Sequence, residues 1–115
     1  MASTDLKHAQ CVPCRGGVPT LTEEEIRQLG PQVPSWRVAE ADGVKRIRRD
    51  FMFPDFRAAL DFAVRVGELA EQEGHHPDLH VSWGKVTVET WTHKIHGLHR
   101  NDFILAAKID QIYGS

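Results

Sequence analysis

Residues 71–93 read EQEGHHPDLHVSWGKVTVETWTH, and this stretch holds the pattern that decides the fold. Gly74 stands where the end of a helix favours a left-handed residue, so we expect a helix to end just before it. Apolar and polar residues then alternate from Leu79, which is typical of a half-buried strand. Gly84-Lys85 has the glycine-first order of a type II′ turn and predicts a hairpin with a return strand over 86–92.

Three histidines flank this hairpin, with His75 and His76 before it and His93 after it. A tight hairpin returns its second strand to the level at which the first began, so we expect the three imidazoles to gather at one end of the sheet. Each imidazole taken singly would more often be a capping or loop residue. Together they predict a proton-transfer site, because histidine has an unperturbed pKa of about 6.5.

A metal site is the other chemistry that clustered histidines suggest. His76 and His80 are four residues apart, the spacing that places two ligands on one helix face. Pro77 makes the intervening segment extended, so these side chains need not converge, and no carboxylate or thiolate completes an obvious tetrahedral set. We therefore expect no bound metal, and we expect His80, His96 and His99 to lie on the surface.

The chain before residue 54 predicts one helix and two strands. The helix begins with the capping box Thr22-x-x-Glu25 and ends at Gly30-Pro31. A short strand over 36–40 turns at 41–43 into a longer strand over 44–53. We expect these two strands to pair with each other as a hairpin.

Two more helices complete the predicted fold. Pro54 suits the first turn of a helix that continues to Glu73, and the last helix follows Gly97. The apolar stripe predicted for the helix after Pro54 is Phe56, Leu60, Ala63, Val64, Gly67 and Ala70. The order α-β-β-α-β-β-α predicts an α+β fold, a four-stranded antiparallel sheet with three helices packed on one face.

Composition and charge exclude several classes of protein. The 115 residues suit one domain, and the net charge of −2 provides no basic field to attract nucleic acid or an anionic membrane. No apolar run approaches the roughly 20 residues that cross a bilayer. The first ten residues, MASTDLKHAQ, lack the apolar region of a signal peptide, so we expect a cytoplasmic location.

Residues 1–19 are polar and rich in glycine and proline, and they predict a flexible extension before a domain over 20–115. The only cysteines, Cys11 and Cys14, lie in this extension as a CxxC pair. A structural zinc site usually takes four ligands, and this pair supplies two. We expect two reduced thiols in a surface tail, with zinc shared across a dimer or a disulfide as the alternatives.

The run Glu71-x-x-x-His75-His76-Pro77, followed by Trp83, His93 and Asp102 at this spacing, resembles the pterin-4a-carbinolamine dehydratases. These enzymes are also called 4a-hydroxytetrahydrobiopterin dehydratases. The resemblance covers residues 20–113, including the capped first helix and the closing run from Gly97.

The resemblance implies a substrate and a reaction. The family converts a 4a-hydroxytetrahydropterin to the quinonoid dihydropterin and water, in the regeneration of tetrahydrobiopterin. A ring nitrogen expels hydroxide from C4a, so the step needs a general acid and a nearby base, and it needs no metal or other cofactor. This requirement agrees with a site built from imidazoles.

The resemblance also assigns roles to the histidines. His75 and His93 would be the acids that approach the 4a-hydroxyl from either side of the pterin. His76 would orient the substrate and assist proton removal.

Five more residues would complete the substrate-binding site: Glu71, Pro77, Thr92, Trp36 and Asp102. Glu71 would orient a histidine, and Thr92 would contact the pterin partly through its backbone. Trp36 would wall the pocket, although a core tryptophan is an equal alternative. Asp102 would either stabilise the start of the last helix or orient a site histidine.

Three positions depart from the family pattern. Gly74 replaces the Asn or Asp of many relatives and removes a polar contact. His99 replaces a Ser or Thr at the start of the last helix, and imidazole is expected to cap poorly. Trp91 is large for its position and is expected to narrow or shield the pocket.

The family is oligomeric, so the resemblance implies a homodimer or homotetramer joined through sheet edges and helices. The sequence offers no support for the coactivator role that animal relatives have. A pterin-binding or scaffold protein without catalysis, serving a molybdopterin-containing enzyme or another partner, is the alternative function.

Overall fold

The computed structural model describes residues 5–13 and 15–114 of the chain. The helices are α1 (Glu23–Leu29), α2 (Phe56–Glu73) and α3 (Arg100–Tyr113), and the strands are β1 (Arg37–Ala41), β2 (Val44–Met52), β3 (Asp78–Ser82) and β4 (Lys85–Thr90). Short 3-10 helices occur at η1 (Leu6–His8), η2 (Gly30–Gln32) and η3 (His93–Ile95). The predicted order α-β-β-α-β-β-α is confirmed.

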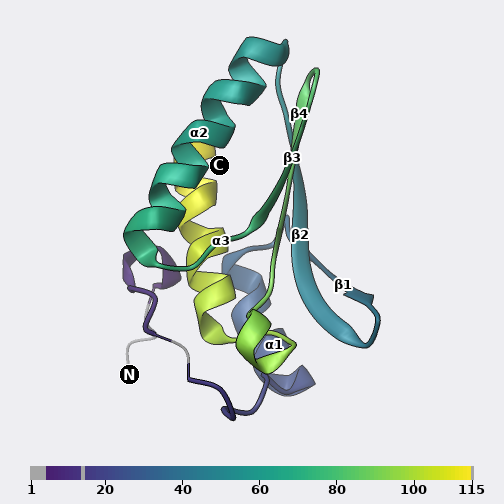
Figure 1. Cartoon of the computed structure of the whole chain (residues 1–115), viewed down its shortest axis with the longest axis vertical. Helices are drawn as coiled ribbons and strands as arrows, with labels where there is room; N and C mark the ends of the chain where they lie inside the picture. Colours follow the sequence, from purple (N-terminus) through teal and green to yellow (C-terminus); the bar gives the residue numbers. More distant parts are fainter. Residues whose placement is uncertain (1–4, 14, 115) are drawn as a thin grey trace.

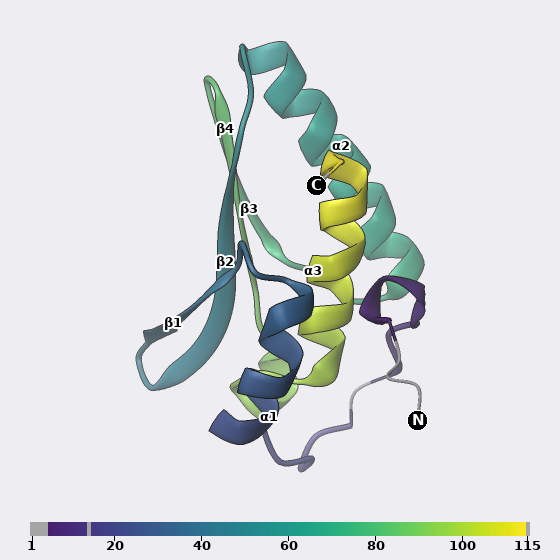
Figure 2. The same cartoon turned by 180° about the vertical axis from the view of Figure 1, so that it is seen from behind.

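The four strands form one antiparallel sheet in the order β1-β2-β4-β3. The central ladder runs from Ile47↔Thr90 to Met52↔Lys85, and it joins the two hairpins into one sheet. The three helices lie on one face of this sheet, and the core fills the space between the two layers (Figure 1 and Figure 2). The predicted α+β architecture is therefore confirmed.

The two hairpin turns differ from each other in their backbone geometry. Asp42 and Gly43 both have positive φ, 54° and 76°, which fits a type I′ turn between β1 and β2. The β3–β4 turn is Trp83-Gly84, because Ser82 pairs with Lys85, so the predicted Gly84-Lys85 loop is wrong by one residue.

Gly84 has a packing role in this turn. Its carbonyl accepts the backbone N–H of Phe53 at 2.9 Å, and a Cβ on Gly84 would lie 3.0 Å from the Phe53 carbonyl oxygen. The close approach of a neighbouring backbone therefore accounts for the glycine, and a glycine-first turn does not.

Helix α2 begins later than predicted. The side chain of Asp55 accepts the backbone N–H of Ala58 at 2.9 Å, so Asp55 is the N-cap and Pro54 lies outside the helix. The other end matches the prediction, because Gly74 has φ of 67° and forms the left-handed C-cap. This cap turns the chain directly into His75.

The buried face of α2 also differs from the predicted stripe. Ala63 and Ala70 are buried as predicted, but Phe56 and Val64 are 45% and 53% exposed. The core instead receives Ala59, Phe62 and Val66. Two apolar faces lie side by side on this helix, and the spacing of residues alone does not decide which one packs against the sheet.

A buried polar network ties β2 and the chain before β1 to α3. One carboxylate oxygen of Asp110 accepts from the indole of Trp36 at 2.8 Å and from the guanidinium of Arg49 at 2.7 Å. Burial raises the pKa of Asp110, while these two donors act in the opposite direction. Trp36 also meets Phe51 edge to face, with ring centroids 5.9 Å apart.

The N-terminal residues 5–13, called the strap below, pack against the fold. Leu6 is fully buried in the core, and its N–H donates to the side chain of Gln32 at 2.8 Å. The helix η1 lies against α3. The prediction that residues 1–19 extend outside the domain is thus corrected for the strap, while Cys14 lies outside the described residues.

Candidate active site

Three imidazoles line one pocket of about 400 Å³ at the end of the sheet where α2 stops. They are His75, His76 and His93, which the hairpin pattern predicted to converge there. Pockets for small ligands typically enclose about 300–1,000 Å³. The pocket is therefore large enough for a small organic molecule.

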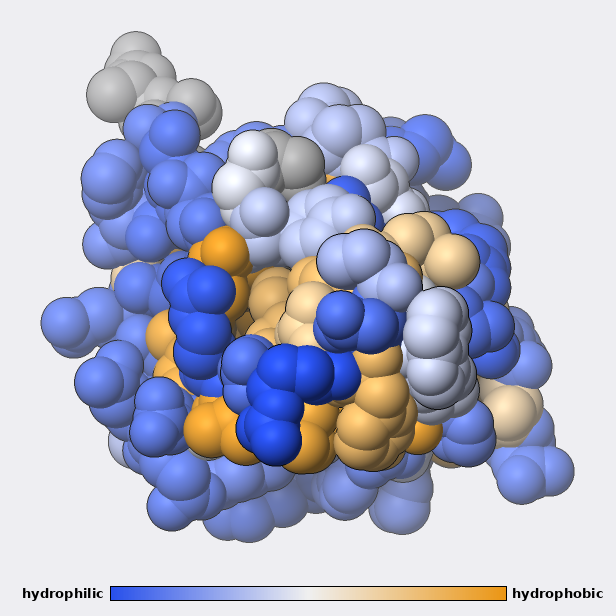
Figure 3. All heavy atoms as spheres, turned by 90° about the horizontal axis from the view of Figure 1, so that it is seen from above, coloured by the Kyte–Doolittle hydropathy of each residue, from blue (hydrophilic) through white to orange (hydrophobic). Residues whose placement is uncertain are grey.

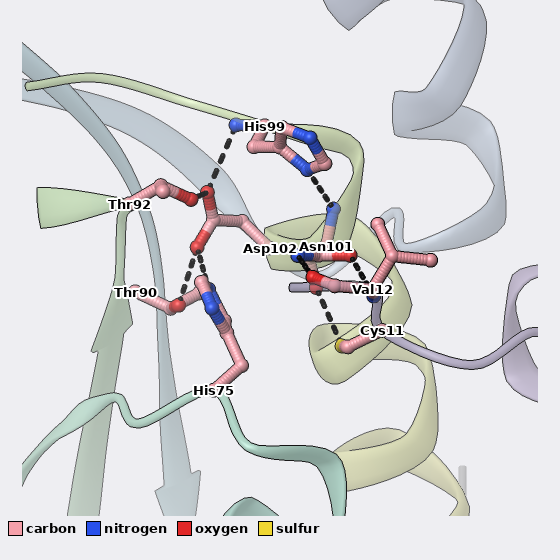
Figure 4. Close-up of polar contacts among 8 residues, drawn as sticks. All are labelled: Cys11, Val12, His75, Thr90, Thr92, His99, Asn101 and Asp102. Atoms are coloured by element: carbon pink, nitrogen blue, oxygen red, sulfur yellow. Dashed lines mark hydrogen bonds and ion pairs between the residues drawn. The ribbon is translucent and has the colours of Figure 1, made fainter. Parts of the chain in front are cut away.

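Asp102 holds His75 at one side of this pocket. His75 Nε2 lies 2.6 Å from Asp102 Oδ1, with the His75 side chain 10% exposed and that of Asp102 fully buried (Figure 4). The hydroxyls of Thr90 and Thr92 donate to the same carboxylate at 2.7 and 2.9 Å, and the backbone N–H of His99 donates at 3.0 Å. Four groups from three segments thus fix one carboxylate.

The local sequence explains this convergence. Thr90 and Thr92 are two residues apart near the end of β4, so their side chains lie on the same side. Asp102 is the third residue of α3 and reaches back to the N–H of His99 as in a capping box. Because a carboxylate only accepts hydrogen bonds, His75 Nε2 is the donor in this pair, and Nδ1 is the atom that can exchange a proton with a ligand.

His76 has a more exposed carboxylate partner. Its Nε2 lies 2.6 Å from Glu71 Oε2, one turn back on α2, and both side chains are largely exposed. The predicted role of Glu71, to orient a histidine, therefore has a matching contact. The Gly74 cap between them reverses the chain so that this pair can form.

His93 begins the 3-10 helix η3 and stacks on Trp91, with ring centroids 4.6 Å apart and planes at 29°. The guanidinium carbon of Arg46 lies 4.1 Å from the centroid of the Trp91 ring. Trp91 itself lines the pocket. It therefore supports His93 as well as narrowing the space beside it.

His99 is half-buried and caps α3, where an exposed and poorly capping residue was predicted. Its Nδ1 accepts the backbone N–H of Asn101 at 3.0 Å, which completes the capping box with Asp102. Burial lowers the pKa of His99, partly opposed by the charge of Asp102. An unprotonated Nδ1 is what this hydrogen bond requires.

The remaining predicted residues occupy different places. Trp36 lies in the core beside Phe51 and does not line this pocket, so its predicted role as a wall is wrong. Pro77 lines a separate hollow of about 870 Å³ on the outer face of the sheet, together with His80. Asp102 is too deeply buried to meet a ligand, and Thr92 reaches the pocket with its hydroxyl committed to Asp102.

Five residues at or behind the pocket were missed in the sequence, and one of them is Lys94, which lines the pocket directly after His93. Thr90 shares its side of the strand with Thr92, and this spacing of two could have indicated a common partner. Val12 and Pro13 line the pocket from the strap, and Asn101 lines it from α3. No local pattern connects residues so far apart in the chain.

Two negative findings concern residues 5–13 and 15–114. In these ranges no group of three or more His, Cys, Asp or Glu side chains is arranged to hold a metal ion. None of the helices described is long and apolar enough to cross a membrane.

Comparison with protein families and curated proteins gives consistent matches. The family described as Pterin 4 alpha carbinolamine dehydratase matches residues 19–112. A Nitrosococcus oceani protein with the provisional name pterin-4-alpha-carbinolamine dehydratase is 53% identical over 108 residues, 94% of this chain and 96% of the relative. A Chlorobium limicola protein with the same provisional name is 56% identical over 104 residues, 90% of this chain and 92% of the relative.

Two solved structures have a similar fold. A crystal structure described as a transcriptional coactivator/pterin dehydratase from Brucella melitensis has a TM-score of 0.74 and 32% identity, over 83% of this chain and 99% of that chain. A pterin dehydratase-like protein described as a RuBisCO assembly factor in the alpha-carboxysome has a TM-score of 0.61 over 70% of this chain and 92% of that chain. At 22% identity, the second likeness concerns the fold alone.

Proposed function

The chain belongs to the pterin-4a-carbinolamine dehydratase family, and on this premise we propose that it dehydrates a 4a-hydroxytetrahydropterin to the quinonoid dihydropterin. The observation that carries the proposal is the set of three imidazoles around one pocket, one of them held by a buried carboxylate. The reaction would serve the regeneration of tetrahydrobiopterin.

The chemistry requires two proton transfers. A ring nitrogen lone pair forms a double bond to C4a as the C4a–O bond breaks, and hydroxide leaves as water once it is protonated. The ring nitrogen then loses its proton to a base. Positioned acids and bases typically accelerate such steps by about 10²–10⁴-fold.

The geometry supports a division of roles among the histidines. His75 Nδ1 would protonate the departing hydroxyl, because Asp102 occupies Nε2 and fixes the ring. His93 would approach the hydroxyl from another side, with its ring plane set by Trp91. His76, with Glu71 as its partner, would orient the substrate and accept the ring proton.

A stopped-flow assay with a synthetic 4a-hydroxytetrahydropterin tests this proposal. We expect His75→Ala and His93→Ala each to lower kcat by about 10²–10⁴-fold, the range of general acid–base catalysis. His80→Ala is the matched control, because His80 is exposed and lines the hollow on the other face of the sheet. A folded His75→Ala/His93→Ala double variant that turns over at the wild-type rate refutes the mechanism.

Binding without catalysis is the alternative, and the same assay separates it. A pterin-binding or scaffold protein would bind the product pterin by calorimetry and leave the spontaneous dehydration rate unaltered. Acceleration that depends on His75 and His93 excludes this alternative.

A further inference from the structure

The strap reaches the pocket although it lies before the family match, which begins at residue 19. Val12 and Pro13 line the pocket together with the three imidazoles. The family model therefore assigns Val12 and Pro13 no role.

Asn101 clamps the backbone of Val12 from both sides. Its Oδ1 accepts the Val12 N–H at 3.0 Å, and its Nδ2 donates to the Val12 carbonyl at 2.7 Å (Figure 4). Asn101 is 2% exposed, so the side-chain end of this clamp is buried. Such a two-way contact fixes the position of a residue without constraining its side chain.

A second anchor holds the preceding residue. The Cys11 N–H donates to Glu73 Oε1 at 2.9 Å. The Cys11 thiol donates to the Asn101 carbonyl oxygen, with 3.5 Å between sulfur and oxygen. Glu73 in turn lies 3.5 Å from Lys108 of α3. Together with buried Leu6, these contacts keep the strap at the pocket.

The clamp leaves an apolar wall. Val12 uses its N–H for Asn101, and Pro13 has no N–H to offer. The Val12 side chain is 56% exposed, so a ligand in the pocket can cover it. This wall therefore favours an apolar part of the ligand. Polar ligand groups placed against it would lose their hydrogen bonds to water and gain none in return.

We propose that Val12 and Pro13 select the substituent at C6 of the pterin, and that Asn101 is the positioning residue for this wall. The inference rests on the proposed function and refines its substrate class. The amino, N3–H and carbonyl groups of a pterin belong to its pyrimidine ring, and the nitrogens N5 and N8 of the reduced ring lie on either side of its two outer carbons. The reduced ring ends in carbon at C6 and C7, so that edge matches the wall.

Calorimetry with two stable probes tests the wall, namely 7,8-dihydropterin and 6-methyl-7,8-dihydropterin. Val12→Ala raises the Kd of the 6-methyl probe about fivefold and that of the unsubstituted probe less than about twofold, because the lost methyl contacts involve the C6 group. Equal effects on both probes, or none, overturn the proposal. Val18→Ala is the matched control, an exposed valine outside the pocket, and it alters neither Kd.

A double-mutant cycle tests the role of Asn101. Asn101→Ala weakens binding of the 6-methyl probe as Val12→Ala does, and the double variant is no weaker than Asn101→Ala alone, because one residue acts through the other. Additive losses mean that Asn101 binds the pterin itself, which overturns its positioning role. In the dehydration assay, Val12→Ala raises KM for the 6-methyl substrate and changes kcat by less than about twofold.

The two proposals fail in different ways. Wild-type protein that binds both probes without accelerating dehydration refutes the proposed function, and the two Kd values still decide the role of the wall. Wild-type protein that accelerates dehydration but binds neither probe overturns the role of the wall and leaves the proposed function standing.

Discussion

Asp102 is fully buried and yet accepts from four donors, which a neutral amide of the same size could not do. Asp102→Asn would turn an NH2 group towards at least one donor. The His75 ring would then lose its fixed orientation. The carboxylate is thus the residue on which the geometry of the site most depends.

We expect Asp102→Asn to lower kcat about a hundredfold, the lower part of the general acid–base range, with a smaller effect on KM because Asp102 does not reach the pocket. Stopped-flow kinetics measure both constants. Asp50→Asn is the matched control, since the exposed Asp50 also accepts from a threonine, Thr87 at 2.7 Å, on the outer face. An unaltered kcat for a folded Asp102→Asn protein contradicts this role.

Cys11 is predicted to be unreactive in the folded protein. Burial, and then the carboxylate of Glu73, raise the pKa of its thiol from 9.0 to about 12, so almost no thiolate exists at neutral pH. Iodoacetamide at pH 7.5 should label Cys11 slowly in the native protein and readily in urea, as measured by mass spectrometry of the peptides. Fast native labelling would contradict the buried position.

The same shift has a consequence for stability at high pH. The thiol ionises near pH 9 when the chain is unfolded and near pH 12 when it is folded. The contribution of the protonated thiol to stability is therefore complete below pH 9 and is lost as the pH rises towards 12. Cys11→Ser, which retains a donor, should show a weaker decline of unfolding free energy above pH 9.

Single residues show how far sequence reasoning extends. The convergence of His75, His76 and His93 followed from a cap and a hairpin, which are local patterns. Trp36 could not be placed in this way, because both a pocket wall and a core position suit an indole. Trp36 donates a hydrogen bond to Asp110, which lies 74 positions later in the chain, and this contact places the indole in the core.

Among the elements, α3 depends on an uncommon cap. His99 accepts the Asn101 N–H only while Nδ1 is unprotonated. Burial lowers its folded-state pKa; Asp102 opposes this shift, while His75 and Arg100 reinforce it. The contribution of the cap is therefore present above the unfolded pKa of about 6.5 and is lost as the pH falls through the folded value.

Urea unfolding of wild type, His99→Ala and His99→Asn tests this cap. His99→Ala should lose about 1 kcal/mol at pH 7.5, the usual contribution of an N-cap. His99→Asn should retain most of that stability and decline less than wild type between pH 7.5 and pH 5. Parallel declines for wild type and His99→Asn would exclude His99 as the titrating group.

Two helix ends were predicted correctly because residues of the same segment form the cap. The Thr22–Glu25 capping box and the left-handed Gly74 lie where expected. The Trp83-Gly84 turn was misplaced because Gly84 is required by contact with Phe53, a residue of another hairpin. Patterns within one segment do not contain such contacts.

At the scale of the whole molecule, apolar surface remains uncovered on α2. Phe56 and Val64 are exposed there, and Met52 is 61% exposed at the end of β2. Figure 3 shows apolar side chains at the surface at this end of the molecule. We expect the exposed side of α2 to join copies of the chain, which is the homo-oligomer that the family resemblance predicts.

Val64→Glu should then reduce the molar mass measured by light scattering, because it places a charge on the apolar face. Arg65→Glu introduces the same carboxylate one residue away, off this face, and should leave the mass unaltered. A monomeric wild-type protein, or equal effects of both variants, would contradict this expectation.

The clamp between Val12 and Asn101 joins residues 89 positions apart. A ribosome makes Val12 89 residues before Asn101, and Asp102 emerges directly after Asn101. Neither the wall nor the orientation of His75 can form until the start of α3 has left the exit tunnel. A nascent chain can therefore assemble its hairpins before Asn101 and Asp102 emerge to complete its pocket.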